Sequence, residues 1–144
     1  MNLQIHVDGG SRGNPGPAAV GVVIADAGTG KSLHEAGYFL GTTTNNVAEY
    51  RGLLRALRLA IPLEPDSTVI HSDSQLMVRQ ITGEYQVKSD AIRPLHEQAQ
   101  SLLLQLGGWQ IKHVRREQNK RADELVNEAM DLGGDVVTID LSEG

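Results

Sequence analysis

The spacing of apolar residues changes close to residue 44, and this change limits the fold more than any other feature of the sequence. Before it, apolar and polar residues alternate, first through residues 3–8 and then within residues 18–41, which is typical of strands. A Gly-containing turn at Ala27–Lys31 divides the second stretch into two strands. After it, residues 45–61 carry apolar side chains at helical spacing. The chain is therefore predicted to combine a sheet with helices.

The rest of the chain continues this mixed pattern. We predict strands over residues 67–73 and 109–114, helices over residues 74–83 and 119–134, and a longer helix over residues 89–108. Ser89 or Asp90 is expected to cap the longer helix, and Gly107 to close it. The predicted fold is α/β, a five-stranded mixed sheet flanked by helices in the order βββαβααβα. Residues 1–134 are expected to form one domain, and residues 135–144 a C-terminal tail that is either an edge strand or disordered.

Composition excludes several classes of protein. The chain has 144 residues, enough for a hydrophobic core without cross-links, and it contains no Cys. Disulfides, thiolate zinc sites and cysteine nucleophiles are thereby excluded. No apolar run reaches membrane-spanning length and no secretory signal pattern is present, so we expect a cytoplasmic protein without a membrane partner. Nothing in the sequence implies an obligate protein partner, and a monomer is expected.

Acidic residues carry the main functional signal. The net charge of −5 at pH 7 argues against a general nucleic-acid binder, yet an acidic cluster that holds cations gives the same balance. Asp8 and Asp73 each follow an apolar strand, whereas Glu49 and Asp123 lie in the first turns of predicted helices. Each acid by itself is more often a surface residue or a helix cap. The hypothesis is that the four converge at one edge of the sheet.

Carboxylates held this close together would repel one another unless cations neutralised them. Oxygen ligands without Cys suit Mg²⁺ or Mn²⁺ rather than zinc, and two such ions can assist phosphodiester hydrolysis.

The sequence does not match the common phosphate-binding loop motifs. The segment AGTGKS at residues 27–32 has Ala25 where that motif needs Gly, and the Gly-rich loop at residues 9–16 does not read G-x-G-x-x-G. The sequence therefore favours metal-assisted phosphoryl chemistry.

Four segments resemble type 1 ribonuclease H, the ribonuclease HI family, and occur in that family's order. They are DGGSRGNPGPAAVGVVI at residues 8–24, TTNNVAEYRGLLRAL at 43–57, SDSQLMVRQI at 72–81 and HVRREQNKRADELVNEA at 113–129. The resemblance implies the ribonuclease H fold and an endonuclease that hydrolyses the RNA strand of RNA/DNA hybrids by a two-metal-ion mechanism, leaving 3′-hydroxyl and 5′-phosphate ends. The alternatives are a non-catalytic hybrid-binding module on the same fold, and a hydrolase acting on duplex RNA or in DNA processing.

The resemblance also implies roles for individual residues. Asp8 would bridge two metal ions, with Mg²⁺ expected and Mn²⁺ as the alternative. Asp73 would ligate as well and help to orient the attacking water. Glu49 would hold the ion on the leaving-group side and contact a ribose 2′-hydroxyl, and Asp123 would complete the other ion. The positions that match the family's minor-groove contacts to the hybrid are Asn14, Asn45, Asn46 and Gln75.

A fifth catalytic position is open between two residues. His113 precedes Asp123 by ten residues, the family's spacing for a mobile catalytic His, but it also lies at a predicted strand end, where a structural role is the alternative. Part of the family carries the pattern HV-x-RE, which places Arg116 in that role. The basic, Trp-rich protrusion of many bacterial members is absent, so weak hybrid affinity with a modest salt dependence is expected. A solvated helix face is predicted for Arg51, Arg55 and Arg58.

Overall fold

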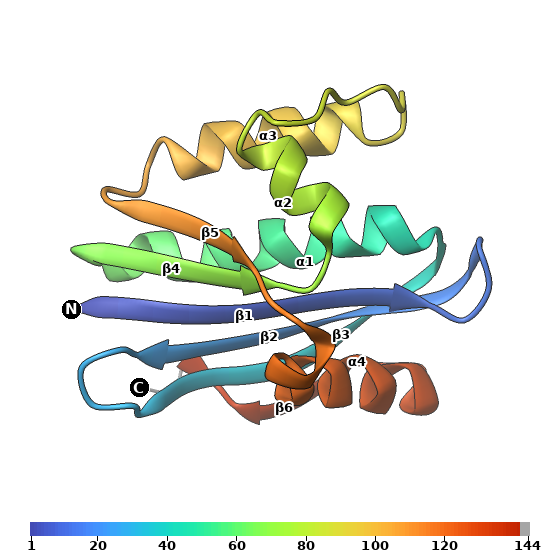
Figure 1. Cartoon of the computed structure of the whole chain (residues 1–144). Coiled ribbons are helices and arrows are strands. Elements are labelled where there is room, and N and C mark those ends of the chain that lie inside the picture. Colours follow the sequence, from blue (N-terminus) through green and yellow to red (C-terminus); the bar gives the residue numbers. More distant parts are fainter. Residues whose placement is uncertain (142–144) are drawn as a thin grey trace.

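Strands from both halves of the chain form one mixed sheet at the centre of the molecule (Figure 1). The computed structural model describes residues 1–141. Within this range the sheet has six strands in the spatial order β5-β4-β1-β2-β3-β6. The strands are β1 (Asn2–Ser11), β2 (Gly16–Asp26), β3 (Ser32–Thr43), β4 (Ser67–Ser72), β5 (Trp109–His113) and β6 (Val136–Ile139). The helices are α1 (Asn45–Ala60), α2 (Gln75–Ile81), α3 (Arg93–Leu103) and α4 (Lys120–Leu132), with short 3₁₀ turns at Ile61–Leu63 and Arg116–Gln118.

The direction of each strand follows from the connection that precedes it. β1, β2 and β3 are joined by short loops and pair antiparallel, whereas β4 and β5 follow helical connections and pair parallel to β1 and β4. Asp26 closes the loop between β2 and β3, because its Oδ1 accepts a hydrogen bond from the Gly28 N–H at 2.8 Å. β6 pairs antiparallel with β3 at the outer edge. The sheet is therefore mixed.

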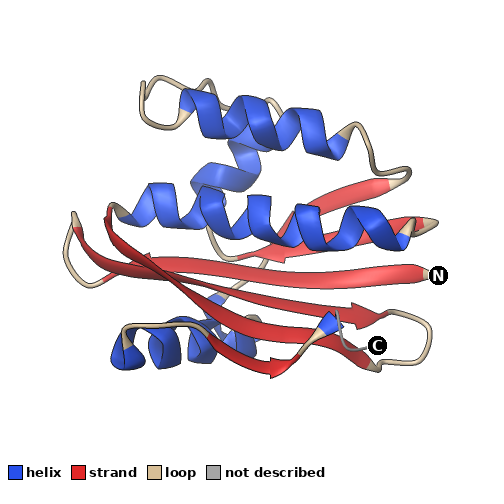
Figure 2. Ribbon diagram, turned by 180° about the vertical axis from the view of Figure 1, so that it is seen from behind, coloured by secondary structure: helices blue, strands red, loops and turns tan. Residues whose placement is uncertain are grey.

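Helices cover the two faces of the sheet unequally (Figure 1, Figure 2). α1, α2 and α3 lie on one side, where the main core includes the fully buried Leu53 and Leu57 of α1. α4 covers the other face over β2 and β3, and its buried cluster consists of the small residues Ala19 and Ala129 with Val126. Side chains this small bring a helix close to the strands, which matters because α4 carries one of the predicted site residues.

Two glycines allow α4 to pack directly on strand backbone. Gly21 of β2 and Gly37 of β3 are cross-strand partners beneath α4. A Cβ atom at Gly21 would lie 2.1 Å from the Ala122 carbonyl oxygen, and one at Gly37 would lie 2.3 Å from the Leu125 carbonyl oxygen. Any side chain at either position would push the helix outward. These glycines therefore fix the distance between α4 and the sheet.

Two predictions about the elements are corrected by the structure. The sheet has a sixth strand within the described range, β6, so the five-stranded prediction is wrong and the order of elements ends in a further strand. This strand forms because β3 offers an unpaired edge to the segment that follows α4. The part of the tail prediction that concerns residues 142–144 lies outside the described residues. α3 begins at Arg93 because Ser89 instead caps the preceding turn, where its Oγ accepts from the Ile92 N–H at 3.3 Å.

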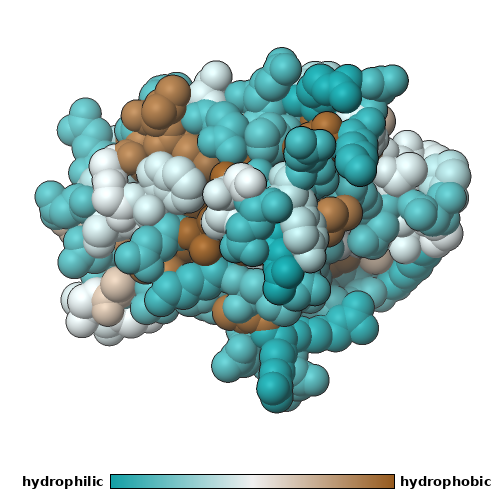
Figure 3. All heavy atoms as spheres, turned by 45° about the horizontal axis from the view of Figure 1, so that its top comes forward, coloured by the Kyte–Doolittle hydropathy of each residue, from teal (hydrophilic) through white to brown (hydrophobic). Residues whose placement is uncertain are grey.

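Hydrophilic side chains cover most of the molecular face in Figure 3, and apolar residues form small separate patches on it. The predicted arginine face of α1 is exposed. Two of its members also make contacts, since Arg55 lies 4.0 Å from the Tyr38 ring centre and Arg58 donates to Gln98 Oε1 at 3.1 Å. Among the helices within residues 1–141, none has the length and apolarity needed to cross a membrane.

We expect Gly21→Ala to destabilise the fold by about 1–3 kcal/mol, because the added methyl group overlaps the backbone of α4 and no side-chain rotation relieves the overlap. Urea denaturation followed by circular dichroism measures this free energy of unfolding. Gly107→Ala is the matched control, since a Cβ atom there meets nothing within 4 Å. Equal stability of the two variants would contradict the close packing of α4.

Candidate active site

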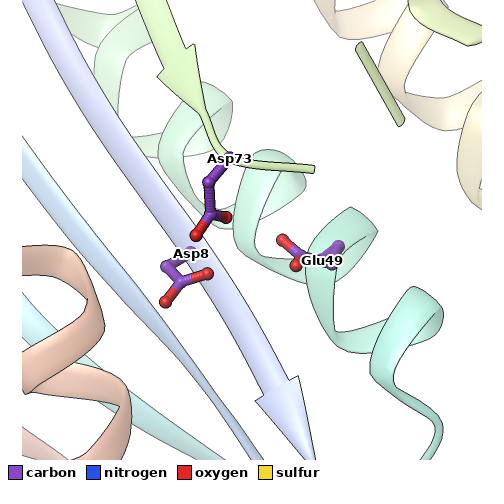
Figure 4. A group of neighbouring side chains, drawn as sticks. All are labelled: Asp8, Glu49 and Asp73. Atoms are coloured by element: carbon purple, nitrogen blue, oxygen red, sulfur yellow. The ribbon is translucent and has the colours of Figure 1, made fainter. Parts of the chain in front are cut away.

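Three of the predicted carboxylates meet where β1 and β4 are neighbours (Figure 4). The two strands run parallel with Val7 opposite Ser72, so the next residues, Asp8 and Asp73, come side by side. Glu49 reaches the same place from α1 (Figure 4). One oxygen atom from each of the three carboxylates lies within 4.8 Å of the other two. The structure thus brings together residues that are 24 to 65 positions apart in the chain.

Asp8 lies inside β1, whereas the sequence placed it at the end of the strand. The pairing of β1 with β2 continues through the glycines that follow and ends with Ser11 opposite Ala18. Asp8 is 6% exposed, and its Oδ1 accepts a hydrogen bond from the Gly9 N–H at 2.9 Å. The strand therefore holds this carboxylate rigidly instead of presenting it on a loop.

The position of Glu49 depends on a glycine in the facing strand. A Cβ atom at Gly9 would lie 2.4 Å from the Ala48 carbonyl carbon and 2.5 Å from the Glu49 nitrogen, so α1 comes this close to β1 only because Gly9 has no side chain. Thr44 begins the helix, since its hydroxyl accepts from the Val47 N–H at 3.3 Å. The cap and the glycine together bring the buried Glu49 to the Asp8 carboxylate.

A cavity of about 340 Å³ opens over these carboxylates. Asp123, from the first turn of α4, and Arg116, from the 3₁₀ turn before it, both line this cavity. All four predicted acids therefore face one hollow, although Asp123 lies outside the tight group formed by the other three. The cavity lining consists of Asp8, Gly9, Gly10, Ser11, Arg12, Asn45, Glu49, Asp73, Arg116, Asp123, Val126, Asn127 and Met130.

Asn119 is a supporting residue that the sequence did not reveal. It is 1% exposed at the start of α4, and its Nδ2 donates to the Val7 carbonyl oxygen at 2.8 Å. This bond ties the beginning of α4 to β1 directly before Asp8, and so helps to hold Asp123 at the cavity. In the sequence, an Asn before a helix indicates an ordinary N-cap, but here the side chain makes no cap hydrogen bond.

Burial and mutual repulsion strongly favour the protonated forms of two of these acids. The pKa of Asp8 is raised to about 9, first by burial and then by the negative charges of Glu49, Asp73 and Asp123. The pKa of Glu49 is raised to about 8 by burial and by Asp73, while Arg116 acts to lower it. The metal-free site thus holds protons at neutral pH, and a bound cation would displace them.

The residues proposed to contact substrate occupy different surroundings. Asn14 Oδ1 accepts from the Asn45 backbone N–H at 3.0 Å, and Asn45 Oδ1 accepts from the Ser11 N–H at 3.3 Å, so these residues join the β1–β2 loop to α1. Asn46 is half-buried in the first turn of α1, and Gln75 is exposed at the start of α2. Of these four, only Asn45 lines the cavity.

The two candidates for the fifth catalytic position are placed differently. His113 is exposed at the end of β5, opposite Ser72 of β4, and does not line the cavity. Arg116 is also exposed but lines the cavity, and its charge acts on Glu49. Of the two candidates, Arg116 is therefore the one that lines the cavity and acts on one of its carboxylates.

The donor set of the cavity fits a hard divalent cation. The three clustered side chains offer only carboxylate oxygens, which Mg²⁺ and Mn²⁺ prefer. Glu49 Oε2 is buried and has no hydrogen-bond partner, which is costly unless a cation or a water occupies the position in front of it. The residues therefore satisfy the chemical requirement for a metal site.

The family assignment agrees with this geometry. A family model described as "Reverse transcriptase-like" matches residues 6–129. Ribonuclease HI of Halobacterium salinarum is 44% identical over 129 residues, which cover 90% of this chain and 64% of that protein. The chain belongs to the type 1 ribonuclease H family.

Two further relatives of this ribonuclease H-family chain define the extent of the likeness. A bifunctional protein of Mycobacterium tuberculosis is 41% identical over 140 residues, which cover 97% of this chain and 38% of that protein. An RNase H1 isolated from compost, solved in complex with an RNA/DNA hybrid, has a TM-score of 0.85 and 42% identity, with 91% of this chain and 98% of that one covered. The chain spans 38% to 64% of the length of these curated relatives.

Without metal, we expect the protein to lose stability as pH rises from 5 to 9. Unfolded Asp and Glu titrate near pH 4, whereas folded Asp8 and Glu49 titrate at about 9 and about 8, so in this window the folded state binds more protons. The free energy of unfolding then falls with pH, by at most about 1.4 kcal/mol per pH unit for each proton, and the stabilisation present below pH 4 is lost as pH passes the folded pKa.

Urea denaturation in EDTA at several pH values measures this slope for the wild type and for Asp8→Asn. The variant lacks one of the titrating groups and also lowers the repulsion on Glu49, so its stability should fall less steeply with pH. His6, His34 and His71 have lowered pKa values and act in the opposite direction, but they do so in both proteins. Parallel curves for the two proteins would show that Asp8 is not the source.

Proposed function

We propose that this chain is a metal-dependent endonuclease that hydrolyses the RNA strand of RNA/DNA hybrids. The observation that carries the proposal is the convergence of Asp8, Glu49 and Asp73 within 4.8 Å, with Asp123 on the same cavity. Buried carboxylates at this density are unfavourable in a merely structural role, because each raises the energy of ionising the others. The hybrid-bound structure of a relative that covers nearly the whole chain supports the choice of substrate.

Each acid has a defined part in this proposal. The four acids would hold two Mg²⁺ ions, with Mn²⁺ as an alternative. Asp8 would serve both ions and Asp73 would also ligate, while Asp123 would complete the ion on the nucleophile side and Glu49 the ion on the leaving-group side. When bound, the two ions supply an activated water and stabilise the departing oxygen. Asp73 also orients the attacking water, and the products carry 3′-hydroxyl and 5′-phosphate ends. A monomer suffices, since one chain provides all four acids.

Recognition of RNA is assigned to the polar residues around the cavity. The Asn14 side chain accepts from the Asn45 backbone N–H and the Asn45 side chain from the Ser11 backbone N–H, so both side chains are ordered before substrate arrives. Glu49 and these amides, together with Asn46 and Gln75, contact sugars in the minor groove, where the 2′-hydroxyl distinguishes RNA from DNA. The glycines in the floor of the cavity leave room for the sugar–phosphate backbone to approach.

We expect an end-labelled RNA/DNA hybrid to be cut in its RNA strand when Mg²⁺ or Mn²⁺ is present and to stay intact in EDTA. Asp73→Asn should lower kcat by at least about 100-fold, because an amide cannot neutralise a cation or accept a proton from the attacking water. Gel analysis of the products also reads out the chemistry of the ends. Single-stranded RNA, duplex RNA and duplex DNA of the same sequence are the substrate controls.

Asp26→Asn is the matched protein control, because Asp26 lies at the end of β2, next to the β2–β3 loop, and does not line the cavity. Equal rates for Asp73→Asn and wild type would refute the site assignment. A wild-type protein that binds hybrid without cutting it would instead be a binding module, and efficient cutting of duplex RNA would indicate a different hydrolase on the same fold.

We expect Arg116→Ala to reduce kcat by about 10-fold or more, and His113→Ala to change it by less than about 3-fold. The reason is position, since Arg116 lines the cavity and acts on Glu49, whereas His113 is exposed outside the lining. Steady-state kinetics on the hybrid measures both effects. A larger loss for His113→Ala would assign the fifth catalytic position to the histidine.

A further inference from the structure

One cation in the cavity is paired with an acid on its rim. Arg12 follows β1 directly and lines the cavity. Its Nη2 lies 2.7 Å from Asp131 Oδ1 and 3.4 Å from Asn127 Oδ1. Both partners belong to α4, near its C-terminal end. The side chains of Arg12 and Asp131 are 47% and 69% exposed, so water reaches the pair.

The two residues that Arg12 contacts lie on the same face of α4 as Asp123. Asp123, Asn127 and Asp131 are spaced by four residues, which places them on one face of α4. Asn127 Nδ2 also donates to the Asp123 carbonyl oxygen at 3.0 Å. Asp131 is about 12 Å along the helix from Asp123, since each residue rises about 1.5 Å. Arg12 thus lies in the part of the cavity lining toward the C-terminal end of α4, away from Asp123.

Arg12 is one of the few positively charged residues in a cavity lined by acids. Among the described residues that line it, only Arg12 and Arg116 are cationic, against the carboxylates of Asp8, Glu49, Asp73 and Asp123. Arg116 already acts on Glu49. Arg12 is therefore the cation that is placed to meet a more distant phosphate, and in the substrate-free protein Asp131 neutralises it.

The ion pair has no evident structural duty. The backbone holds the loop by itself, because the Arg12 N–H donates to the Pro17 carbonyl at 2.8 Å and the Ser11 N–H donates to Asn45 Oδ1. Asp131 lies in the last turn of α4, where the helix dipole disfavours a negative charge. An acid that helps neither the loop nor the helix is best explained by its effect on Arg12.

We propose that Arg12 exchanges Asp131 for a backbone phosphate of the hybrid, so that Asp131 competes with the substrate and limits its affinity. The inference rests on the function proposed above and adds a positioning residue and its competitor to that site. An exposed ion pair is weak, so it is readily replaced, and a backbone phosphodiester, which carries the same single charge as a carboxylate, offers the guanidinium two oxygens for a bidentate contact. Asn127 keeps the guanidinium near the rim during the exchange.

Fluorescence anisotropy with a labelled RNA/DNA hybrid tests the exchange, with each variant placed in the Asp73→Asn background so that the hybrid is not cut. Asp131→Asn is expected to tighten binding by about 2- to 5-fold. Arg12→Gln is expected to weaken binding and to lower the slope of log affinity against log salt by about one. The double variant should match Arg12→Gln, because Asp131 acts only through Arg12.

Asp90→Asn is the matched control, since it removes one negative charge from another exposed pair, Arg93–Asp90 at the start of α3, and should leave hybrid affinity unchanged. In the cleaving protein, the gain of Asp131→Asn should fall on KM, and its melting temperature should not drop. Weaker or unchanged binding by Asp131→Asn, an unchanged salt slope for Arg12→Gln, or an equal gain from Asp90→Asn would each overturn the exchange while hybrid cleavage stands. If the wild-type protein neither bound nor cleaved the hybrid, the proposed function itself would fall.

Discussion

The parallel pairing of β1 with β4 is the constraint on which the site depends. It sets Val7 opposite Ser72 and thereby puts Asp8 beside Asp73, two acids that repel each other. Burial of the apolar residues that alternate with them, such as Ile5 and Ile70, holds the strands in this register. A slip by one residue would turn every core side chain outward, so the hydrophobic core enforces an arrangement that electrostatics opposes.

Glycines set how closely the helices approach these strands. Gly9 lets α1 approach β1 so that Glu49 arrives, and Gly21 with Gly37 lets α4 approach the other face so that Asp123 arrives. The two helices thus reach one cavity from opposite faces of the sheet. Asn119 then fixes the start of α4 to β1 through the Val7 carbonyl. The geometry of the candidate site thus depends on how closely the helices approach the strand backbone, and glycines set that distance.

The carboxylate cluster carries an energetic penalty that function explains. Asp8 and Glu49 are pushed toward their neutral forms by burial and by neighbouring carboxylates, and Glu49 Oε2 is buried without a partner. In the function proposed above, bound cations would relieve all three problems together, which would link metal binding to stability. The same acidity makes positive charge valuable at the rim, where Arg12 and Arg116 stand.

The sequence alone determined most elements and the four acids. Alternation through residues 3–8 and helical spacing through residues 45–61 are local patterns, and the motifs around Asp8, Glu49, Asp73 and Asp123 are contiguous, so both can be recognised without a fold. Only the tertiary structure decided what depends on distant partners. β6 forms because β3 has a free edge, β1 runs on to Ser11 because β2 pairs with it, and the side chain of Asn119 donates to a carbonyl 112 residues away. Such contacts join residues far apart in the chain, and no local pattern encodes them.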